Sequence, residues 1–333
     1  MGVGHLEPDT SSDDFAEDDM SLFSSTASLR SSILRSIEEN GRKYHGYKDG
    51  KYLLPDDEVK DPITVFVIAG TAVSLTPSSK NSTGKYDLCL LTFDHILSFA
   101  PFTKLNRVLD VGCGVGYWAL DFAEMHPESQ VIGVDLSPPP NVQFEIDDLE
   151  ESWNFSYPFD YIHALMMTGA FRDWPNFYRQ AFENLTGDGW VEIQDIHFPL
   201  YCDDDTMRPD GAIKRWSDLM VEAGEKSGFK LTACGRAGDM MHEAGFVDIV
   251  RIPYKWPINE WPREPKWKEV GRRTAINFRE GMSAIMMALF TRFMGWSKEQ
   301  VEEFSAQVDK EWQDTRVHAY FCIWVTYGKK PVA

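Results

Sequence analysis

Three glycines and two aspartates are spaced as in a ligand-binding turn between two strands. The glycines alternate with other residues: Gly112, Gly114 and Gly116. Asp110 precedes them at the end of an apolar run that begins at Val108, and an amphipathic stretch over 117–125 follows. A β-rich run over 131–134 then ends in Asp135. This order predicts a strand, a tight turn, a helix and a second strand, which together form the first half of a doubly wound sheet.

Such a turn offers a ligand two kinds of contact. Glycines let the ligand lie against bare backbone, and the N-terminus of the next helix presents unpaired N–H groups. Asp135 is placed to accept hydrogen bonds from ribose hydroxyls. Nicotinamide dinucleotides and S-adenosylmethionine share this geometry. A dinucleotide fingerprint needs a glycine where Tyr117 stands, whereas an acid at position 110 suits a cationic ligand with an α-amino group. The spacing therefore favours S-adenosylmethionine.

Composition limits the class of protein. The chain has 333 residues, 43% of them hydrophobic, and a formal net charge of −19, which argues against a nonspecific electrostatic grip on nucleic acid. Its five cysteines form no C-x-x-C pair, which is typical of a reducing compartment. The apolar part of the uncharged run 62–79 is interrupted by threonine, glycine and serine, so no membrane span is predicted. Without a secretion signal, we expect an intracellular protein of the cytoplasm or nucleus.

The Asp110 loop and an aromatic N-terminal segment resemble a known family. The D-x-G-x-G-x-G pattern is similar to motif I of class I S-adenosylmethionine-dependent methyltransferases. The segment 44–58, with a Tyr-His-x-Tyr…Tyr-x-Leu-Pro-x-Asp-Glu pattern, resembles the fungal LaeA-like methyltransferases. The resemblance implies a role in fungal secondary metabolism and an N-terminal segment that closes the cofactor pocket with Tyr44 and Tyr52. In that family a regulator can also act through velvet-type partners in a nuclear complex, so enzyme and regulator both remain open.

The resemblance implies a doubly wound, Rossmann-like α/β sheet of seven strands with helical cap insertions. We expect a disordered acidic tail over 1–27, a lid segment over 28–59 that begins with a helix over 28–40, and a methyltransferase domain over 90–330. The cap elements lie around 205–230 and 255–315. The expected cofactor site comprises Asp110, Gly112, Cys113, Gly114, Gly116, Asp135, Leu136, Asp147, Asp148, Tyr44 and Tyr52.

The stretch 60–89 departs from the family pattern. A charged helix normally leads into the Leu-Thr-Phe-Asp segment, which stands here at 91–94, but a β-rich run over 63–73 and a loop-like run over 76–84 replace that helix. A genuine insertion and translated noncoding sequence would both produce this pattern.

The remaining strands are expected at 141–146, 161–165 and 190–196, with a turn at 187–189 and a helix at 174–185. A strand over 246–252, a loop over 255–268, helix over 269–296, and a helix capped by Ser297 lead to an antiparallel strand over 318–327. Asp147 and Asp148 would end the third strand near the adenine, unless they form a solvated turn.

Methyl transfer needs an aligned acceptor and, for a hydroxyl, a general base. His163 and His197 stand at strand ends and are the candidate bases, although a structural role is the alternative for each; His242 ranks lower. Asp203, Asp204 and Asp205 invite a magnesium site, but a solvated loop is the preferred interpretation and no metal is expected.

Two further patterns favour packing over binding. The methionines and phenylalanines over 282–294 fit a helical core, or the lining of a pocket for an apolar acceptor. Basic residues interleaved with tryptophans over 254–279 could contact nucleic acid, but a cap packed on the sheet is favoured. The expected partners are a small-molecule acceptor or a regulatory protein, without direct nucleic-acid or membrane binding.

Overall fold

The computed structural model describes residues 36–39, 42–45, 84–114, 116–135, 145–146 and 149–332. Within these ranges no helix is both long and apolar enough to span a membrane. Tyr52, Leu136, Asp147 and Asp148 lie outside the described residues, as does most of the 60–89 stretch.

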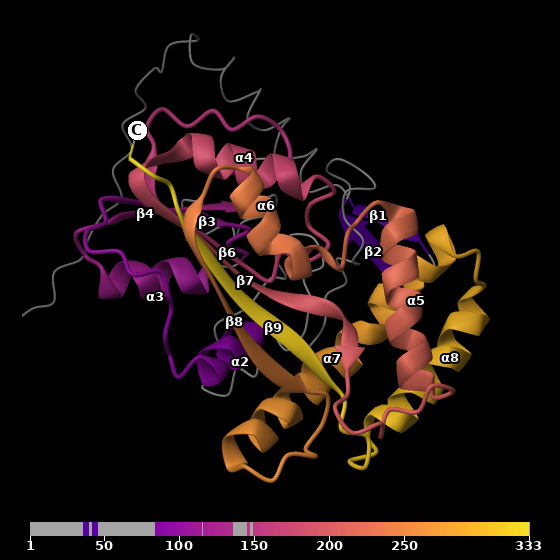
Figure 1. The fold of residues 1–333 in the computed structure, drawn as a ribbon. Helices are drawn as coiled ribbons and strands as arrows, with labels where there is room; N and C mark the ends of the chain where they lie inside the picture. Colours follow the sequence, from indigo (N-terminus) through magenta and orange to yellow (C-terminus); the bar gives the residue numbers. More distant parts are fainter. Residues whose placement is uncertain are drawn as a thin grey trace, which may run out of the picture.

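A seven-stranded sheet forms the centre of the molecule, in the order β5-β4-β3-β6-β7-β9-β8 (Figure 1). Its strands are β3 (Arg107–Val111), β4 (Gln130–Asp135), β5 (Glu145–Ile146), β6 (Phe159–Leu165), β7 (Leu185–Tyr201), β8 (Val247–Pro257) and β9 (Tyr320–Lys329). The first five strands in this order, from β5 through β4, β3 and β6 to β7, are parallel to one another. β9 lies between β7 and β8 and is antiparallel to both. The predicted Rossmann-like sheet and its late antiparallel strand are thus confirmed.

Helices cover both faces of the sheet. The first face carries α2 (Lys85–Thr92) and α3 (Tyr117–Met125), and the second carries α4 (Trp174–Asn184), a short 3-10 turn (Ala233–Arg236) and α6 (Ala237–Glu243). Alternate residues of each strand face opposite layers. Val108 and Tyr161 therefore pack with Trp118 of α3, whereas Leu109 and Ile162 belong to the cluster of α4 and α6.

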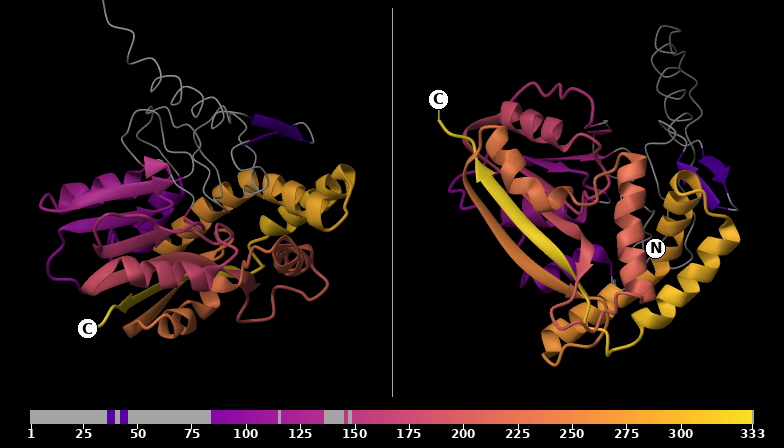
Figure 2. Two further views of the ribbon diagram at one scale, coloured as in Figure 1. Left: turned by 90° about the horizontal axis from the view of Figure 1, so that it is seen from above. Right: turned by 45° about the vertical axis from the view of Figure 1, so that its right-hand side comes forward.

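The longer strands carry the sheet into a helical cap. β7 has 17 residues, whereas β3 has five, so β7 continues past the carboxyl ends of its parallel neighbours. Helices α5 (Ala212–Ser227), α7 (Pro265–Phe293) and α8 (Lys298–Trp312) pack together around these extensions (Figure 2). The shared core joins Phe198 of β7 and Phe321 of β9 to aromatic side chains of the cap: Trp216, Phe278 and Trp312. The cap expected from the sequence is therefore continuous with the sheet.

Several expected boundaries are wrong. Residues 36–39 form β1 (Ser36–Glu39), which pairs antiparallel with β2 (Arg42–His45), although a helix was expected over 28–40. The predicted turn at 187–189 lies within β7. The expected loop over 255–268 is shortened to 258–264, because β8 extends to Pro257 and α7 begins at Pro265. Proline is tolerated on an edge strand such as β8 and at the first turn of a helix.

The capping prediction for the last helix is confirmed. Ser297 Oγ accepts the Gln300 amide at 3.2 Å, and the Gln300 side chain accepts the Ser297 amide at 2.8 Å. These reciprocal bonds satisfy two amides that the first turn of α8 leaves without a helical acceptor.

Candidate functional site

The glycine loop follows β3 at the carboxyl edge of the sheet. Gly112, Gly114 and Gly116 have φ values of 66°, 53° and 81°, a left-handed region that favours glycine. A Cβ at Gly112 would stand 2.2 Å from Met167 Sδ, so this position must be bare to admit the methionine. A Cβ at Gly114 would meet no atom of the described residues within 4 Å. The space beside the Gly114 Cα is therefore open, as a close-lying ligand requires.

Asp110 is held beneath this loop by a histidine. His163 is its register neighbour on β6, and His163 Nδ1 lies 2.9 Å from Asp110 Oδ1. The His163 ring stacks on Trp118, with centroids 3.6 Å apart and planes inclined by 8°. Asp110 is 2% exposed, and burial raises the pKa of its carboxyl, although the bond to His163 opposes that effect.

The second carboxylate oxygen of Asp110 is left without a hydrogen bond to the described residues. Oδ2 is buried and has no hydrogen-bond partner within the described ranges. Leaving a buried acceptor unpaired costs about 1–3 kcal/mol. A ligand that brings an ammonium group to this edge would remove that cost. The unpaired Oδ2 therefore fits the α-amino group of S-adenosylmethionine, and the open space beside Gly114 lets the ligand lie close to the loop.

His163 is placed to hold Asp110 through Nδ1. Its side chain is buried and lies flat against Trp118, because strand alternation turns it toward the α3 layer. Its Nε2 has no hydrogen-bond partner among the described residues, and a base role for His163 stays a prediction.

A row of polar side chains continues from His163 onto β7. Glu192 is the register neighbour of His163, and its Oε2 accepts the Phe99 and Ala100 amides at 2.8 Å each. Gln194 donates to Glu192 Oε1 at 2.8 Å and to the Leu97 carbonyl at 3.1 Å. The sequence reasoning missed these residues. Their signal was a run of acids and an amide inside an otherwise apolar strand, where polar groups need partners.

The loop after β6 touches the glycine loop. Met166 has a left-handed φ of 56°, which is strained for a side chain of its size, and its amide donates to the Gln194 carbonyl at 2.8 Å. Met167 follows and fills the space above Gly112. Strain of this kind gathers at functional sites.

Comparison with known proteins decides the family. A model described as a methyltransferase domain matches residues 85–249. Methyltransferase pytC of Aspergillus terreus is 33% identical over 320 residues, which cover 92% of each chain. The chain belongs to this methyltransferase family. The membership confirms the predicted methyltransferase activity and its S-adenosylmethionine cofactor.

Two other similarities complete the comparison. The secondary metabolism regulator laeA of Aspergillus fumigatus is 31% identical over 320 residues, covering 93% of this chain and 80% of the regulator. A solved phosphoethanolamine N-methyltransferase 2 of Haemonchus contortus, bound to S-adenosylhomocysteine, is 16% identical with a TM-score of 0.43. The match covers 75% of this chain and 53% of that one.

The remaining cofactor residues of the methyltransferase are described in part. Asp135 ends β4 opposite Ile146 of β5, and the preceding Val134 carbonyl accepts the Gly112 and Cys113 amides at 2.8 and 3.1 Å. The backbone thus brings Asp135 beside the glycine loop, as expected. For Asp135 and Tyr44 only the backbone is described, so their contacts with the cofactor stay predictions.

His197 lies on the extension of β7, two residues beyond Asp195. It is half-buried, and burial followed by the charge of Arg251 lowers the pKa of its imidazole. Its ring packs against Gly235, where a Cβ would stand 2.6 Å from Cε1. Its Nδ1 has no partner within the described part of the chain. A base role for His197 stays a prediction.

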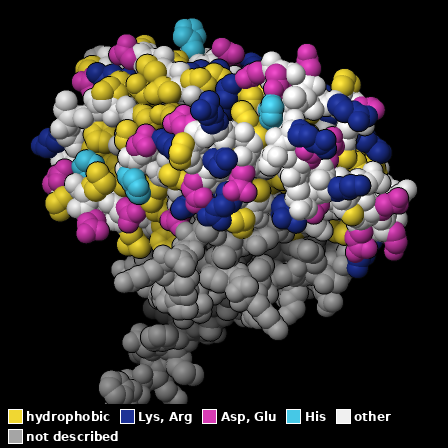
Figure 3. Space-filling model, turned by 90° about the horizontal axis from the view of Figure 1, so that it is seen from below, with side chains coloured by type: hydrophobic (Ala, Val, Ile, Leu, Met, Phe, Trp, Pro, Cys, Tyr) yellow, Lys and Arg dark blue, Asp and Glu magenta, His cyan; other side chains and the backbone are white. Residues whose placement is uncertain are grey.

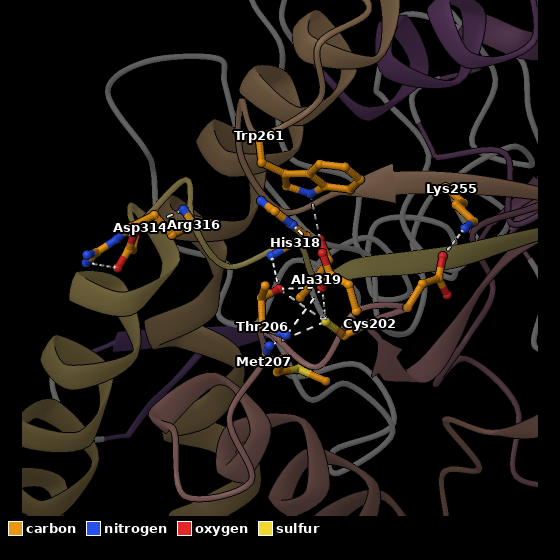
Figure 4. A network of polar contacts seen from close by, with 11 residues as sticks. Cys202, Thr206, Met207, Lys255, Trp261, Asp314, Arg316, His318 and Ala319 are labelled. Atoms are coloured by element: carbon orange, nitrogen blue, oxygen red, sulfur yellow. Dashed lines mark hydrogen bonds and ion pairs between the residues drawn. The ribbon is translucent and has the colours of Figure 1, made fainter.

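Two aspartates of the 203–205 loop have partners on β8, next to or within β9, and in the loop itself. Asp204 lies 2.5 Å from His318 Nδ1 and accepts the Thr206 hydroxyl at 2.7 Å; His318 and Thr206 are labelled in Figure 4. Asp203 pairs with Lys255 at 2.5 Å and accepts the Tyr320 hydroxyl at 2.7 Å. These bonds give both carboxylates partners within the protein. They support the interpretation as a solvated surface loop, which here contacts the start of β9.

The basic and aromatic stretch over 254–279 is engaged with the protein itself. Arg272 and Arg273 pair with Glu269 at 2.7 and 2.8 Å, and Arg279 pairs with Asp309 of α8 at 2.5 Å. Trp256 is buried. On the face seen from below, positive and negative side chains are interspersed (Figure 3). These contacts favour the cap interpretation, and Met286, Met287 and Phe290 are likewise buried in the cap core.

Proposed function

We propose that this methyltransferase binds S-adenosylmethionine at the edge formed by Asp110, Gly114 and Asp135, and that it serves secondary metabolism in a fungus. One observation carries the placement of the donor. The open space beside the Gly114 Cα and the Oδ2 of Asp110, which has no partner among the described residues, lie at the carboxyl ends of parallel strands, where ligands of such sheets bind.

When bound, the cofactor supplies an electrophilic methyl group on a positively charged sulfur. The protein residues contribute position and charge. Asp110 accepts a hydrogen bond from the α-amino group, His163 fixes the direction of that carboxylate, and Asp135 accepts bonds from the ribose. Alignment of this kind contributes about 7–11 kcal/mol to catalysis in favourable model reactions.

The test compares two glycines. Gly114 and Gly295 both have positive φ, and a Cβ at either would meet no described atom within 4 Å. Alanine at either position strains the backbone by about 1–2 kcal/mol, but only Gly114→Ala places a methyl group in the donor's path. We expect Gly114→Ala to weaken S-adenosylmethionine binding about tenfold or more in calorimetry. Gly295→Ala should bind as the wild type does, and equal affinities for both variants would reject the site.

A regulatory function is the second candidate, because the relatives include the secondary metabolism regulator laeA. In that case the chain works through protein partners of the velvet type, in the nucleus, with little turnover of small molecules. Incubation with methyl-labelled donor and a cell extract separates the two. Label in the small-molecule fraction supports the enzyme, whereas label only on proteins, or none with a stable partner recovered, supports the regulator.

A further inference from the structure

Asp195 is a buried carboxylate at the carboxyl edge of β7 that the donor site leaves unused. The parallel pairing of β6 and β7 ends at Leu165 and Gln194, so Asp195 is the first residue past it. The side chain is 0% exposed. Oδ1 accepts the Ile196 amide at 2.8 Å, and Oδ2 has no hydrogen-bond partner among the residues that the structure describes. A second orphaned carboxylate oxygen therefore stands at the same edge as that of Asp110.

The loop after β6 contacts both the glycine loop and the strand residue next to Asp195. Met167 lies on Gly112, and the next residue, Thr168, donates its hydroxyl to the Ile196 carbonyl at 2.7 Å. Thr168 also acts on Asp195 itself, where it lowers the pKa of the carboxyl. Residues 167 and 168 therefore link the glycine loop to the segment of β7 that carries Asp195.

The surroundings of Asp195 shift the pKa of its carboxyl in opposite directions. Burial raises its pKa to about 7, while Thr168, the Ile196 amide and the charge of Lys85 act in the opposite direction. The titratable groups that face it come from three elements: Lys85 and Cys89 of α2, Tyr178 of α4, and Cys234 of the 3-10 turn. A carboxyl in this position gains or loses a proton near neutral pH, as a general base must.

We propose that Asp195 is the catalytic base of the methyl transfer and that the acceptor is a phenolic or enolic hydroxyl. This inference rests on the proposed function. The hydroxyl proton passes to Asp195 Oδ2, and an oxygen lone pair forms the new O–C bond to the methyl carbon. The C–S bond breaks with its electron pair remaining on sulfur, which leaves a neutral thioether. Asp195 then returns its proton to water.

The chemistry of the carboxylate selects the acceptor class. A carboxylate acceptor would be repelled by Asp195, and an amine attacks as its free base without losing a proton at that moment. An aliphatic alcohol is too weak an acid for a group of this strength. A phenol or enol ionises only a few pH units above neutrality, with tyrosine at about 10 as the reference.

The test measures protons released when the donor binds. S-adenosylmethionine and S-adenosylhomocysteine differ in the methyl group and the positive charge that it confers on sulfur. A positive charge near Asp195 favours its ionised form. Calorimetry at pH 7 in phosphate and in Tris, two buffers of different ionisation enthalpy, gives the number of protons released for each ligand. We expect the methylated ligand to release up to about half a proton more, since a carboxyl with a pKa of about 7 is half protonated.

Variants assign that proton to its residue. Asp195→Asn should abolish the excess while leaving the affinity for S-adenosylhomocysteine unchanged. Asp248→Asn is the control, because Asp248 is exposed near the start of β8, at the opposite edge of the sheet. No excess in the wild type, or an excess that persists in Asp195→Asn, would overturn the inference. If neither ligand binds the wild type, the donor site itself fails and the inference falls with it.

The acceptor class has a separate readout. Wild-type protein with methyl-labelled donor and a fungal extract should yield products that carry the label on oxygen, as shown by the chemical shift of the methyl carbon. Label on nitrogen, sulfur or carbon would reject the hydroxyl acceptor.

Discussion

The Asp110 carboxylate depends on a single imidazole for its orientation. We expect His163→Phe, which keeps a ring against Trp118, to lower the free energy of unfolding by about 1–3 kcal/mol because it leaves Asp110 without a partner. Affinity for S-adenosylmethionine should fall about tenfold, as measured by calorimetry, because the carboxylate is no longer held.

A double variant provides the control for this pair. Asp110→Asn combined with His163→Phe should lose less stability than the two single changes added together, because the second change removes the group that the first leaves unpaired. Additive losses in urea denaturation would mean that the two side chains do not act as a unit.

At this scale the spacing of Asp110 and the glycines predicts S-adenosylmethionine as the cofactor, and the family membership confirms that cofactor. The residues that would hold it stay predictions. The sequence shows that His163 stands near a strand end, but it does not show the strand face to which His163 points, and so it does not predict the contact with Asp110. Asp195 and Glu192 were missed because a strand with neighbours on both sides hides the alternation that would separate buried from exposed positions.

The Asp160 carboxylate forms hydrogen bonds at the starts of three parallel strands. Asp160 accepts the Asn106 and Arg107 amides at 2.7 and 3.1 Å and the Thr186 hydroxyl at 3.1 Å, which joins the starts of β3, β6 and β7. Partial burial raises its pKa, but these hydrogen bonds outweigh burial and lower the pKa overall.

The stability that Asp160 provides should depend on pH. A carboxyl with a lowered pKa contributes stability above its unfolded value, 3.8, and loses it as the pH falls further. We expect Asp160→Asn to lower the urea midpoint at pH 7 and to differ less from wild type at pH 3. The exposed Asp205→Asn is the control. A difference from wild type that is as large at pH 3 as at pH 7 would contradict this role.

Elements with strong periodicity were predicted well, and those that depend on tertiary contacts were not. The final strand over 318–327 is aromatic and β-branched, and it lies as expected in β9. The segment over 255–268 was read as a loop because of its prolines. In the structure Pro257 closes an edge strand and Pro265 opens α7, two places where a missing N–H costs nothing. Position in a sheet decides this, and position is absent from a local sequence window.

The cap and the sheet should unfold together. Trp312 is 0% exposed and stands between Trp216, whose ring centroid is 5.4 Å away, and Phe278, at 5.5 Å. We expect Trp312→Ala to lower the free energy of unfolding by about 3–5 kcal/mol. The midpoint of unfolding should shift by the same amount whether it is followed by far-ultraviolet circular dichroism or by tryptophan fluorescence.

The matched control is Trp267→Ala, which removes a half-buried tryptophan of α7 at the margin of the same core. It should cost less and leave a single transition. Two separate transitions in the Trp312 variant would show that the cap folds independently of the sheet.

The continuous run of β7 from Leu185 to Tyr201 has a consequence for protein engineering. One backbone strand carries Glu192 at the donor side and Phe198 in the cap, so no hinge or linker separates the two halves. Chimeras that exchange caps between relatives must therefore be joined in the segments outside the helices and strands, at 202–211, 258–264 and 313–319. Grafts joined there keep the register of the strands. Inserting or deleting an odd number of residues inside β7 would instead turn every following side chain to the opposite face of the sheet.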